Sequence, residues 1–148
     1  MAANGAGMSI IKDSIYTGTG IRFDGNEATT NGGAVFATAL SLFICNSCEF
    51  TNNKATKGGA LYVDANSQTE ITLSNFHRNV ATENGSAFYI ISSKTYPMSF
   101  IKKCNFTYNQ VENFGSIFLN EASLELDQIR LENNLTHGQT SGIALIMS

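Results

Sequence analysis

The chain has 148 residues, of which 14% are charged, and its formal net charge is −3. This length suits one domain, residues 1–148, with its own core, and its scattered Lys and Arg residues form no basic stripe that would bind nucleic acid. No apolar stretch approaches the roughly 20 residues that span a bilayer. The first residues, Met1–Gly7, lack the basic start and apolar centre of a signal peptide.

Along the chain, two short elements recur in phase from residue 21 to 148, and residues 1–20 precede them as an irregular or partial first coil. The first element is a Phe followed three residues later by an Asn, found at Phe23/Asn26, Phe50/Asn53, Phe76/Asn79 and Phe106/Asn109, with Leu131/Asn134 as a weaker fifth copy. The second is a glycine site before a short apolar run, found at Gly32-Gly33, Gly58-Gly59, Gly85-Ser86, Gly115-Ser116 and Ser141-Gly142. A period of roughly 26 residues indicates a stacked repeat architecture.

The third copy shows how one coil is expected to run. Residues 70–74 alternate apolar and polar side chains, which predicts a strand. Residues 76–79 are interpreted as a corner, 80–86 as a polar turn, and 87–91 as a second strand before a loop at 92–97. Residues of one type fall in columns from copy to copy. The columns predict an all-β fold, a parallel β-helix (a β-solenoid) of four to five coils.

The repeated Phe and Asn residues have a structural explanation. Stacked rings fill a continuous core, and stacked Asn side chains hydrogen-bond from coil to coil. Asn also tolerates the left-handed backbone of a corner, and glycines supply positive φ or a close backbone approach at the next corner. We therefore predict a structural ladder made of Phe23, Phe50, Phe76, Phe106, Asn26, Asn53, Asn79, Asn109 and Asn134.

Three cysteines, Cys45, Cys48 and Cys104, do not form the even set of a disulfide framework. Cys48 and Cys104 share a column two coils apart, roughly 9–10 Å from the strand spacing, which is too far for a disulfide. We expect all three to be small buried hydrophobic residues. A Cys45–Cys48 disulfide and a metal site are the alternatives, and a lone Cys-x-x-Cys is a weak signal for a metal.

The strand after the glycines has two alternative registers. In the favoured one, the residues that face the core are Val35, Leu61, Phe88 and Phe118. The residues next to them then form an outward stripe for docking a protein partner or a polysaccharide, made of Phe36, Tyr62, Tyr89, Leu119 and Leu145. The opposite register buries that stripe.

One segment joins both elements: Phe50 to Asn53 is followed by Gly58-Gly59-Ala60-Leu61. This pair resembles the repeats of bacterial polymorphic outer-membrane proteins, and similar repeats occur in large surface proteins of single-celled eukaryotes. The wider class is similar to the pectin-lyase-like right-handed parallel β-helix. The resemblance covers about residues 20–148 and implies a right-handed solenoid located at the cell surface or outside the cell.

The same superfold includes polysaccharide lyases and hydrolases, which need acids on adjacent coils. The columns separate the acids instead. Asp24 aligns with Thr51, His77, Thr107 and Glu132, and Glu49 aligns with Arg22, Asn75, Asn105 and Arg130. His77 and His137 have no evident partner ligands. We therefore predict no catalytic, cofactor-binding or metal-binding residues.

The function favoured by the sequence is a non-enzymatic structural or adhesive module, a rigid repeat segment of a large surface protein or assembly. The alternative is a carbohydrate-active β-helix that binds or cleaves a polysaccharide. The last apolar strand, residues 143–147, has no visible cap. We therefore expect a segment of a longer chain, or coil ends that bind a protein partner or self-associate.

Overall fold

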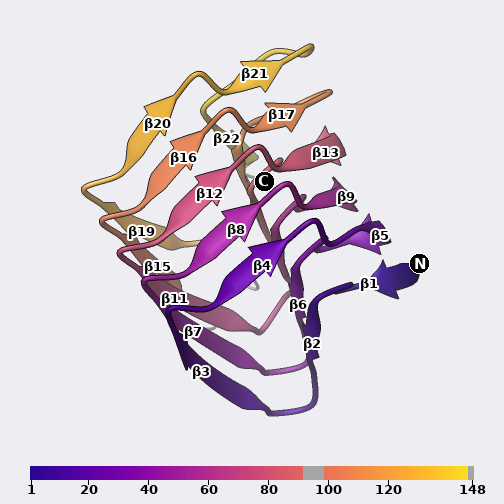
Figure 1. The fold of residues 1–148 in the computed structure, drawn as a ribbon, viewed down its shortest axis with the longest axis vertical. Helices are drawn as coiled ribbons and strands as arrows, with labels where there is room; N and C mark the ends of the chain where they lie inside the picture. Colours follow the sequence, from indigo (N-terminus) through magenta and orange to yellow (C-terminus); the bar gives the residue numbers. More distant parts are fainter. Residues whose placement is uncertain (92–98, 147–148) are drawn as a thin grey trace.

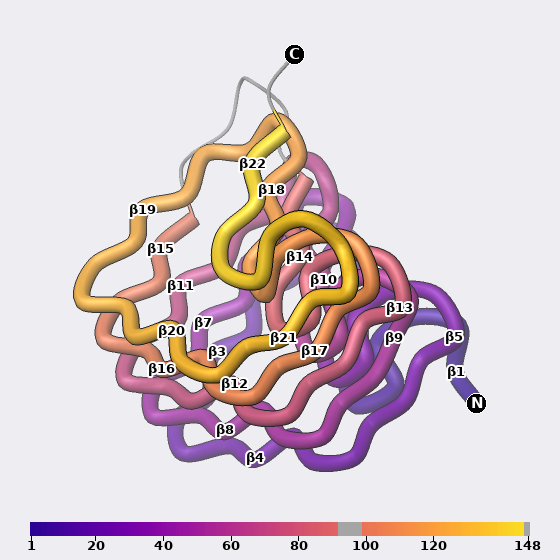
Figure 2. Tube along the Cα trace, turned by 90° about the horizontal axis from the view of Figure 1, so that it is seen from above, coloured from indigo at the N-terminus to yellow at the C-terminus, as the bar shows by residue number. Residues whose placement is uncertain are grey.

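The computed structural model describes residues 1–91 and 99–146, so the loop expected at 92–97 lies outside the described residues. Within the described part the secondary structure is all β, and the strands wind into about five stacked coils of about 26 residues. Each full coil gives one strand to each of four parallel sheets, here called A, B, C and D in chain order. Figure 1 shows the coils rising from β1–β4 to β19–β22, and Figure 2 looks along the stack. The predicted parallel β-solenoid is confirmed.

The strands of each sheet follow one another coil by coil. Sheet A contains β1 (Ala2–Asn4), β5 (Ala28–Asn31), β9 (Lys54–Lys57), β13 (Val80–Asn84), β17 (Gln110–Val111) and β21 (Leu135–Thr136). Sheet B contains β2 (Met8–Ile10), β6 (Val35–Ala37), β10 (Leu61–Val63), β14 (Phe88–Ile91), β18 (Ile117–Asn120) and β22 (Ile143–Ile146). Sheet C contains β3 (Ile15–Thr19), β7 (Leu42–Asn46), β11 (Gln68–Thr72), β15 (Ser99–Lys102) and β19 (Leu124–Asp127). Sheet D contains β4 (Arg22–Asp24), β8 (Glu49–Thr51), β12 (Asn75–His77), β16 (Asn105–Thr107) and β20 (Arg130–Glu132).

The coil contains more strand than its sequence indicates. The expected corner at 76–79 begins as strand β12, and most of the expected polar turn at 80–86 is strand β13. Both strands are polar on the side that faces solvent, so their own propensity for strand is low. They form because coils above and below supply hydrogen-bond partners on both edges. Residues 2–19 likewise already supply three strands, paired with the next coil.

Most bends between sheets in the described residues contain a residue with positive φ. At the bend from D to A this residue is the one before the ladder Asn, such as Asn52 (φ 54°), Arg78 (φ 53°) and Tyr108 (φ 56°). The expectation that the ladder asparagines themselves adopt the left-handed backbone was therefore wrong. What the ladder asparagines share in the structure is hydrogen bonding, while the left-handed position before them is occupied by residues of different types.

The predicted Phe column stacks face to face inside the solenoid. Ring centroids are 5.1 Å apart for Phe23 and Phe50, 4.5 Å for Phe50 and Phe76, and 4.6 Å for Phe76 and Phe106. The rings of Phe50, Phe76 and Phe106 are fully buried. Each ring packs on its own kind at the coil spacing, so this column makes the core continuous from coil to coil.

The Asn column forms a hydrogen-bonded chain beside the rings. The Asn79 amide donates to Asn109 Oδ1 (3.0 Å) and to the Phe50 carbonyl (2.9 Å). Its own Oδ1 accepts hydrogen bonds from the backbone N–H and the side-chain amide of Asn53, both at 3.0 Å. The same pattern runs through the whole column, from Asn26 to Asn134. Every interior amide is thereby used on both its donor and its acceptor side.

The outward stripe expected on sheet B needs two corrections. First, the register slips at the fourth copy of the repeat, where Tyr89 pairs with Phe118 and Phe88 with Ile117. Leu61 donates to the Ala87 carbonyl, two residues after Gly85, whereas Phe88 donates to the Ser116 carbonyl, one residue after Gly115, so the fourth corner is one residue shorter than those before it. A one-residue slip exchanges the two faces of a strand. Phe118 therefore faces outward and Leu119 faces the core, with Leu145 in the same inward column.

Second, the outward column of sheet B is covered rather than exposed. Its stacked rings are Phe36, Tyr62, Tyr89 and Phe118, with centroids 4.9–5.4 Å apart. Tyr62 is 7%, Tyr89 4% and Phe118 2% exposed. Phe114 packs against Phe118, and the Lys57 ammonium lies 5.9 Å from the Tyr89 ring centre. These rings form a second hydrophobic cluster at the bend between sheets A and B, so they do not offer an open docking stripe.

The cysteines also depart from expectation. Cys45 and Cys48 form a disulfide, with Cα atoms 6.0 Å apart, and Cys104 is a buried free thiol. The sequence favoured three free thiols. The bend at Ser47 (φ 54°) turns the chain so that both flanking cysteines point into the core, where both are fully buried. This geometry brings the two sulfur atoms together, which the Cys-x-x-Cys spacing in the sequence could not establish.

We expect thiol counting to show this arrangement directly. Burial raises the pKa of the Cys104 thiol from 9.0 to about 11, so little thiolate is present in the folded chain at pH 8. A thiol reagent should react slowly with native protein, with one thiol in denatured, unreduced protein, and with three after reduction. Because the folded pKa is the higher one, the contribution of Cys104 to stability is intact below pH 9 and is lost as the pH rises to about 11. Three thiols without reduction would contradict the disulfide.

Candidate functional site

The outer face of sheet D, called here the sheet D face, carries two columns of polar side chains. In each of its strands the middle residue points into the core and its two neighbours point outward. The first outward column is Arg22, Glu49, Asn75, Asn105 and Arg130, and the second is Asp24, Thr51, His77, Thr107 and Glu132. Both columns were predicted from the sequence alignment of the coils and are confirmed. Their use as a site was not predicted.

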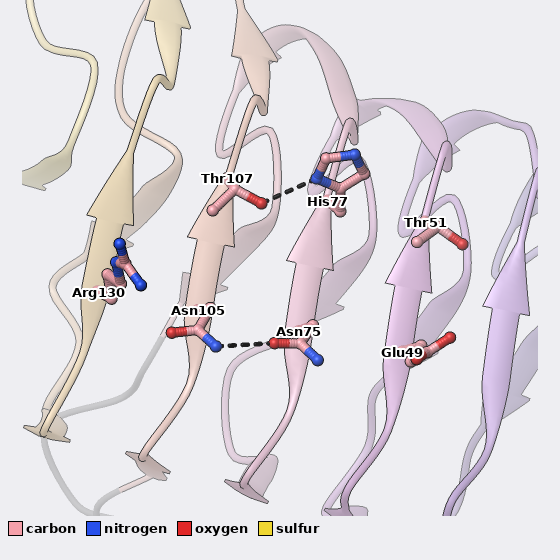
Figure 3. Close-up of a pocket in the computed structure, with 7 residues that line it drawn as sticks. All are labelled: Glu49, Thr51, Asn75, His77, Asn105, Thr107 and Arg130. Carbon is pink, nitrogen blue, oxygen red and sulfur yellow. Dashed lines mark hydrogen bonds between the residues drawn. The ribbon is translucent and has the colours of Figure 1, made fainter.

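A shallow groove of about 330 Å³ runs across this face over strands β8, β12, β16 and β20. Figure 3 shows its lining residues side by side on neighbouring strands. They are Glu49, Thr51, Asn75, His77, Asn105, Thr107 and Arg130. Because every one of these strands is tied into a parallel ladder, the polar groups are held at the strand spacing of about 4.8 Å.

One row of the groove is a polarised chain of amides. The Asn105 amide nitrogen donates to Asn75 Oδ1 at 2.9 Å. In Figure 3 the oxygen of Asn105 points to the side of Arg130, and the nitrogen of Asn75 points to the side of Glu49. The row therefore presents its acceptor end to a cation and its donor end to a carboxylate. The Asn105–Asn75 hydrogen bond orients both amides although they are exposed.

The second row joins an imidazole to hydroxyl groups. His77 Nδ1 lies 2.8 Å from Thr107 Oγ1, and this contact leaves the Nε2 edge of the ring directed away from Thr107. The Tyr108 ring meets the His77 ring edge to face, with centroids 5.5 Å apart and planes at 75°. Tyr108 is 54% exposed and contacts the groove through His77, although it is not itself a lining residue. Donors, acceptors and an aromatic surface therefore occur together.

The charged residues of this face are neutralised at its two ends. At one end, Arg22 lies 3.0 Å from Asp24 and 3.9 Å from Glu49. Hydrogen bonds from Asn52 and Thr51, together with Arg22, hold the pKa of Asp24 below its ordinary value. At the other end, Arg130 lies 2.6 Å from Glu132. The middle of the groove, between Glu49 and Arg130, is lined by no Asp, Glu, Lys or Arg side chain.

The groove is poor in the groups that bind metals or perform acid–base catalysis. Among the residues that line it, the only carboxylate is Glu49. Over residues 1–91 and 99–146, no three His, Cys, Asp or Glu side chains lie together in a way that could hold a metal ion. His137 lies elsewhere, 3.2 Å from the Gln110 amide. The described part of the chain also contains no helix that could cross a lipid bilayer.

The residues predicted from the sequence lie in three places. The ladder Phe and Asn residues line the interior beneath the sheet D face and hold its strands in register. The residues of the expected stripe lie on sheet B: Phe36, Tyr62 and Tyr89 belong to the second hydrophobic cluster, Leu119 belongs to the core, and Leu145 is exposed on the last strand. The sequence placed the groove residues in the correct columns but did not identify them as a site. The signal that marks them is the pair of polar columns flanking each core Phe.

Comparison with known proteins supports the repeat prediction over part of the chain. Residues 20–38 and 47–64 match the Chlamydia polymorphic membrane protein repeat. Each matched segment spans one F-x-x-N element and the Gly-Gly-Ala that follows it, and ends one residue after strand β6 or β10. No curated protein and no solved structure shows significant similarity to the chain. In its first two full copies, the chain is thus similar to a repeat of bacterial membrane proteins.

Proposed function

We propose that this chain is a rigid, non-enzymatic module of a surface protein and that it adheres to partners through the sheet D face. The repeat similarity and the β-solenoid fold support a structural or adhesive role. The observation that carries the choice of face is the middle of the groove, between Glu49 and Arg130, in which Asn75, His77, Asn105 and Thr107 present hydrogen-bonding groups to solvent on a preformed surface. A preformed surface loses little conformational entropy on binding.

Rigidity follows from the interior. The Asn chain and the Phe stack join all coils with contacts that cannot be shifted without breaking several hydrogen bonds at once. Such a module holds its outer faces at fixed positions relative to one another. Rigidity and fixed outer faces suit a spacer or an adhesive segment of a large surface protein. We also propose that the solenoid belongs to the pectin-lyase-like right-handed class.

The disulfide supports a location outside the cytosol. Disulfides such as Cys45–Cys48 persist in oxidising surroundings, including the cell surface and the periplasm. Partner chains or further coils would also have a defined place to attach. Within the described residues, strands β1–β4 and β19–β22 pair on one side only, so any added coil, from this chain or another, extends the same four sheets.

Bead adhesion tests the proposal. Beads coated with the folded chain should adhere to cultured epithelial cells more than albumin-coated beads do. The triple variant Asn75→Ala, Asn105→Ala, Thr107→Ala should reduce adhesion by about tenfold, as loss of several hydrogen-bonding groups predicts. The matched control is Asn46→Ala with Thr72→Ala, an Asn–Thr pair joined at 2.6 Å on sheet C. Equal adhesion by the triple variant and the control would contradict the assignment of the face.

Polysaccharide cleavage is the alternative function, because Glu49, His77 and Arg130 line the same groove. Glycosidases of the usual types use two carboxyl groups about 5–10 Å apart, whereas this groove has one. Incubation of the chain with neutral and acidic polysaccharides should release no reducing ends and no unsaturated products. Release that disappears in Glu49→Gln would replace the adhesive proposal with an enzymatic one.

A further inference from the structure

We propose that the sheet D face binds a neutral, linear glycan that lies along the solenoid axis, across strands β8 to β20. This inference rests on the proposed function, since it names the chemistry of the ligand for the same face. It is drawn from the charge, the spacing and the exposed ring of the groove.

The charge of the face favours an uncharged ligand. Its two columns contain two cations, Arg22 and Arg130, and three anions, Asp24, Glu49 and Glu132, a sum of 2 − 3 = −1. Both cations are already engaged in ion pairs at 3.0 Å and 2.6 Å. An acidic polysaccharide or a nucleic acid would have to break these pairs and would meet a face of the same sign. A neutral ligand meets no such cost.

The spacing of the groove favours a polymer with regularly placed hydroxyl groups. Polar side chains repeat from strand to strand at about 4.8 Å along the axis, and each strand contributes one member to each row. An extended glycan offers hydroxyl groups on every ring at a comparable interval. An extended peptide is a poorer match, because peptides recognise sheets through free strand edges. Strands β8, β12 and β16 are paired on both sides and have no free edge.

Tyr108 supplies the apolar part of the recognition. Sugar rings have one face made of C–H groups, and exposed aromatic rings offer a flat apolar surface for it. The Tyr108 ring is half-exposed and held beside His77, a lining residue of the groove, by an edge-to-face contact. Amides and hydroxyls for the sugar oxygens, beside an aromatic ring for the sugar face, make a combination that suits a glycan better than a protein surface.

Affinity electrophoresis and calorimetry with defined glycans test the inference. The probes are hexasaccharides of β-1,4-linked glucose, N-acetylglucosamine and mannose, with polygalacturonate as the acidic comparison. At least one neutral hexasaccharide should bind, and both Asn75→Ala/Asn105→Ala and Tyr108→Ala should weaken binding by about tenfold. Asn46→Ala/Thr72→Ala on sheet C should bind as the original chain does. Unchanged melting temperatures establish that the variants remain folded.

The outcomes separate this inference from the proposed function. Binding of polygalacturonate alone, binding that ignores Asn75, Asn105 and Tyr108, or no glycan binding would each overturn it. If bead adhesion still depends on Asn75, Asn105 and Thr107 while no glycan binds, the adhesive face stands and its ligand is a protein. If a neutral glycan binds as described while beads do not adhere, the glycan site stands and the adhesive role does not.

Discussion

Asn79→Ala is expected to lower the free energy of unfolding by about 4 kcal/mol, because it leaves buried polar groups without partners at about 1–3 kcal/mol each. The Asn53 backbone N–H loses its acceptor, Asn79 Oδ1, and the Phe50 carbonyl loses the Asn79 amide. Asn79 is fully buried, so water cannot replace these bonds cheaply. Denaturant unfolding followed by circular dichroism measures the loss.

Asn105→Ala is the matched control for this prediction. Asn105 makes one side-chain hydrogen bond, to Asn75, on the exposed sheet D face. Its removal should change the free energy of unfolding by no more than about 0.5 kcal/mol, as for most surface substitutions. Comparable losses for Asn79→Ala and Asn105→Ala would show that the interior asparagine chain does not stabilise the coils.

The ladder was readable from the sequence because its signal is repetition of the same residue at a fixed period. Phe50, Phe76 and Phe106 recur with Asn53, Asn79 and Asn109, and only stacking in register places like on like. The same alignment gave the correct neighbours on the outer face of sheet D, where Thr51, His77 and Thr107 form one column. The repeat period in the sequence thus determines which residues stack on one another from coil to coil.

Register within a coil was harder to predict, because it depends on the length of each corner. In the third copy Gly85-Ser86-Ala87 precedes the strand, whereas in the fourth Gly115-Ser116 leads directly to Ile117. Apolar residues occupy both faces of sheet B, so hydrophobicity does not reveal the slip. The burial of Tyr62 and Tyr89 likewise depends on the neighbouring bend, which places Phe114 and Lys57 beside these rings.

The polar strands and the disulfide depend on tertiary context in a similar way. Residues 80–84 have a weak strand signal of their own, and they become β13 because β9 and β17 pair with them. The sulfur atoms of Cys45 and Cys48 meet because the bend at Ser47 directs both inward. In each case the sequence contains the residues, and the stacking of coils decides their conformation.

Gly58→Ala is expected to lower the free energy of unfolding by at least about 3 kcal/mol, since it combines a left-handed backbone with a steric clash. Gly58 has φ +63°, and a Cβ atom added there would lie 2.4 Å from the Leu61 carbonyl oxygen and 2.8 Å from its carbon. These are backbone atoms of strand β10, which both neighbouring coils hold in place. The corner therefore cannot relax without disturbing sheet B.

Gly25→Ala separates the two contributions. Gly25 has nearly the same backbone, φ +67°, but an added Cβ would meet nothing within 4 Å. Its substitution should cost only the left-handed preference, about 1–2 kcal/mol. The bend of Gly25 accepts Asn52, Arg78 and Tyr108 in later coils, whereas the bend of Gly58 has a left-handed glycine in five coils, at Gly5, Gly32, Gly58, Gly85 and Gly115. Equal losses of unfolding free energy for the two variants would show that positive φ alone explains the need for glycine at position 58. A larger loss for Gly58→Ala would show that glycine is needed there because the corner lies close to sheet B.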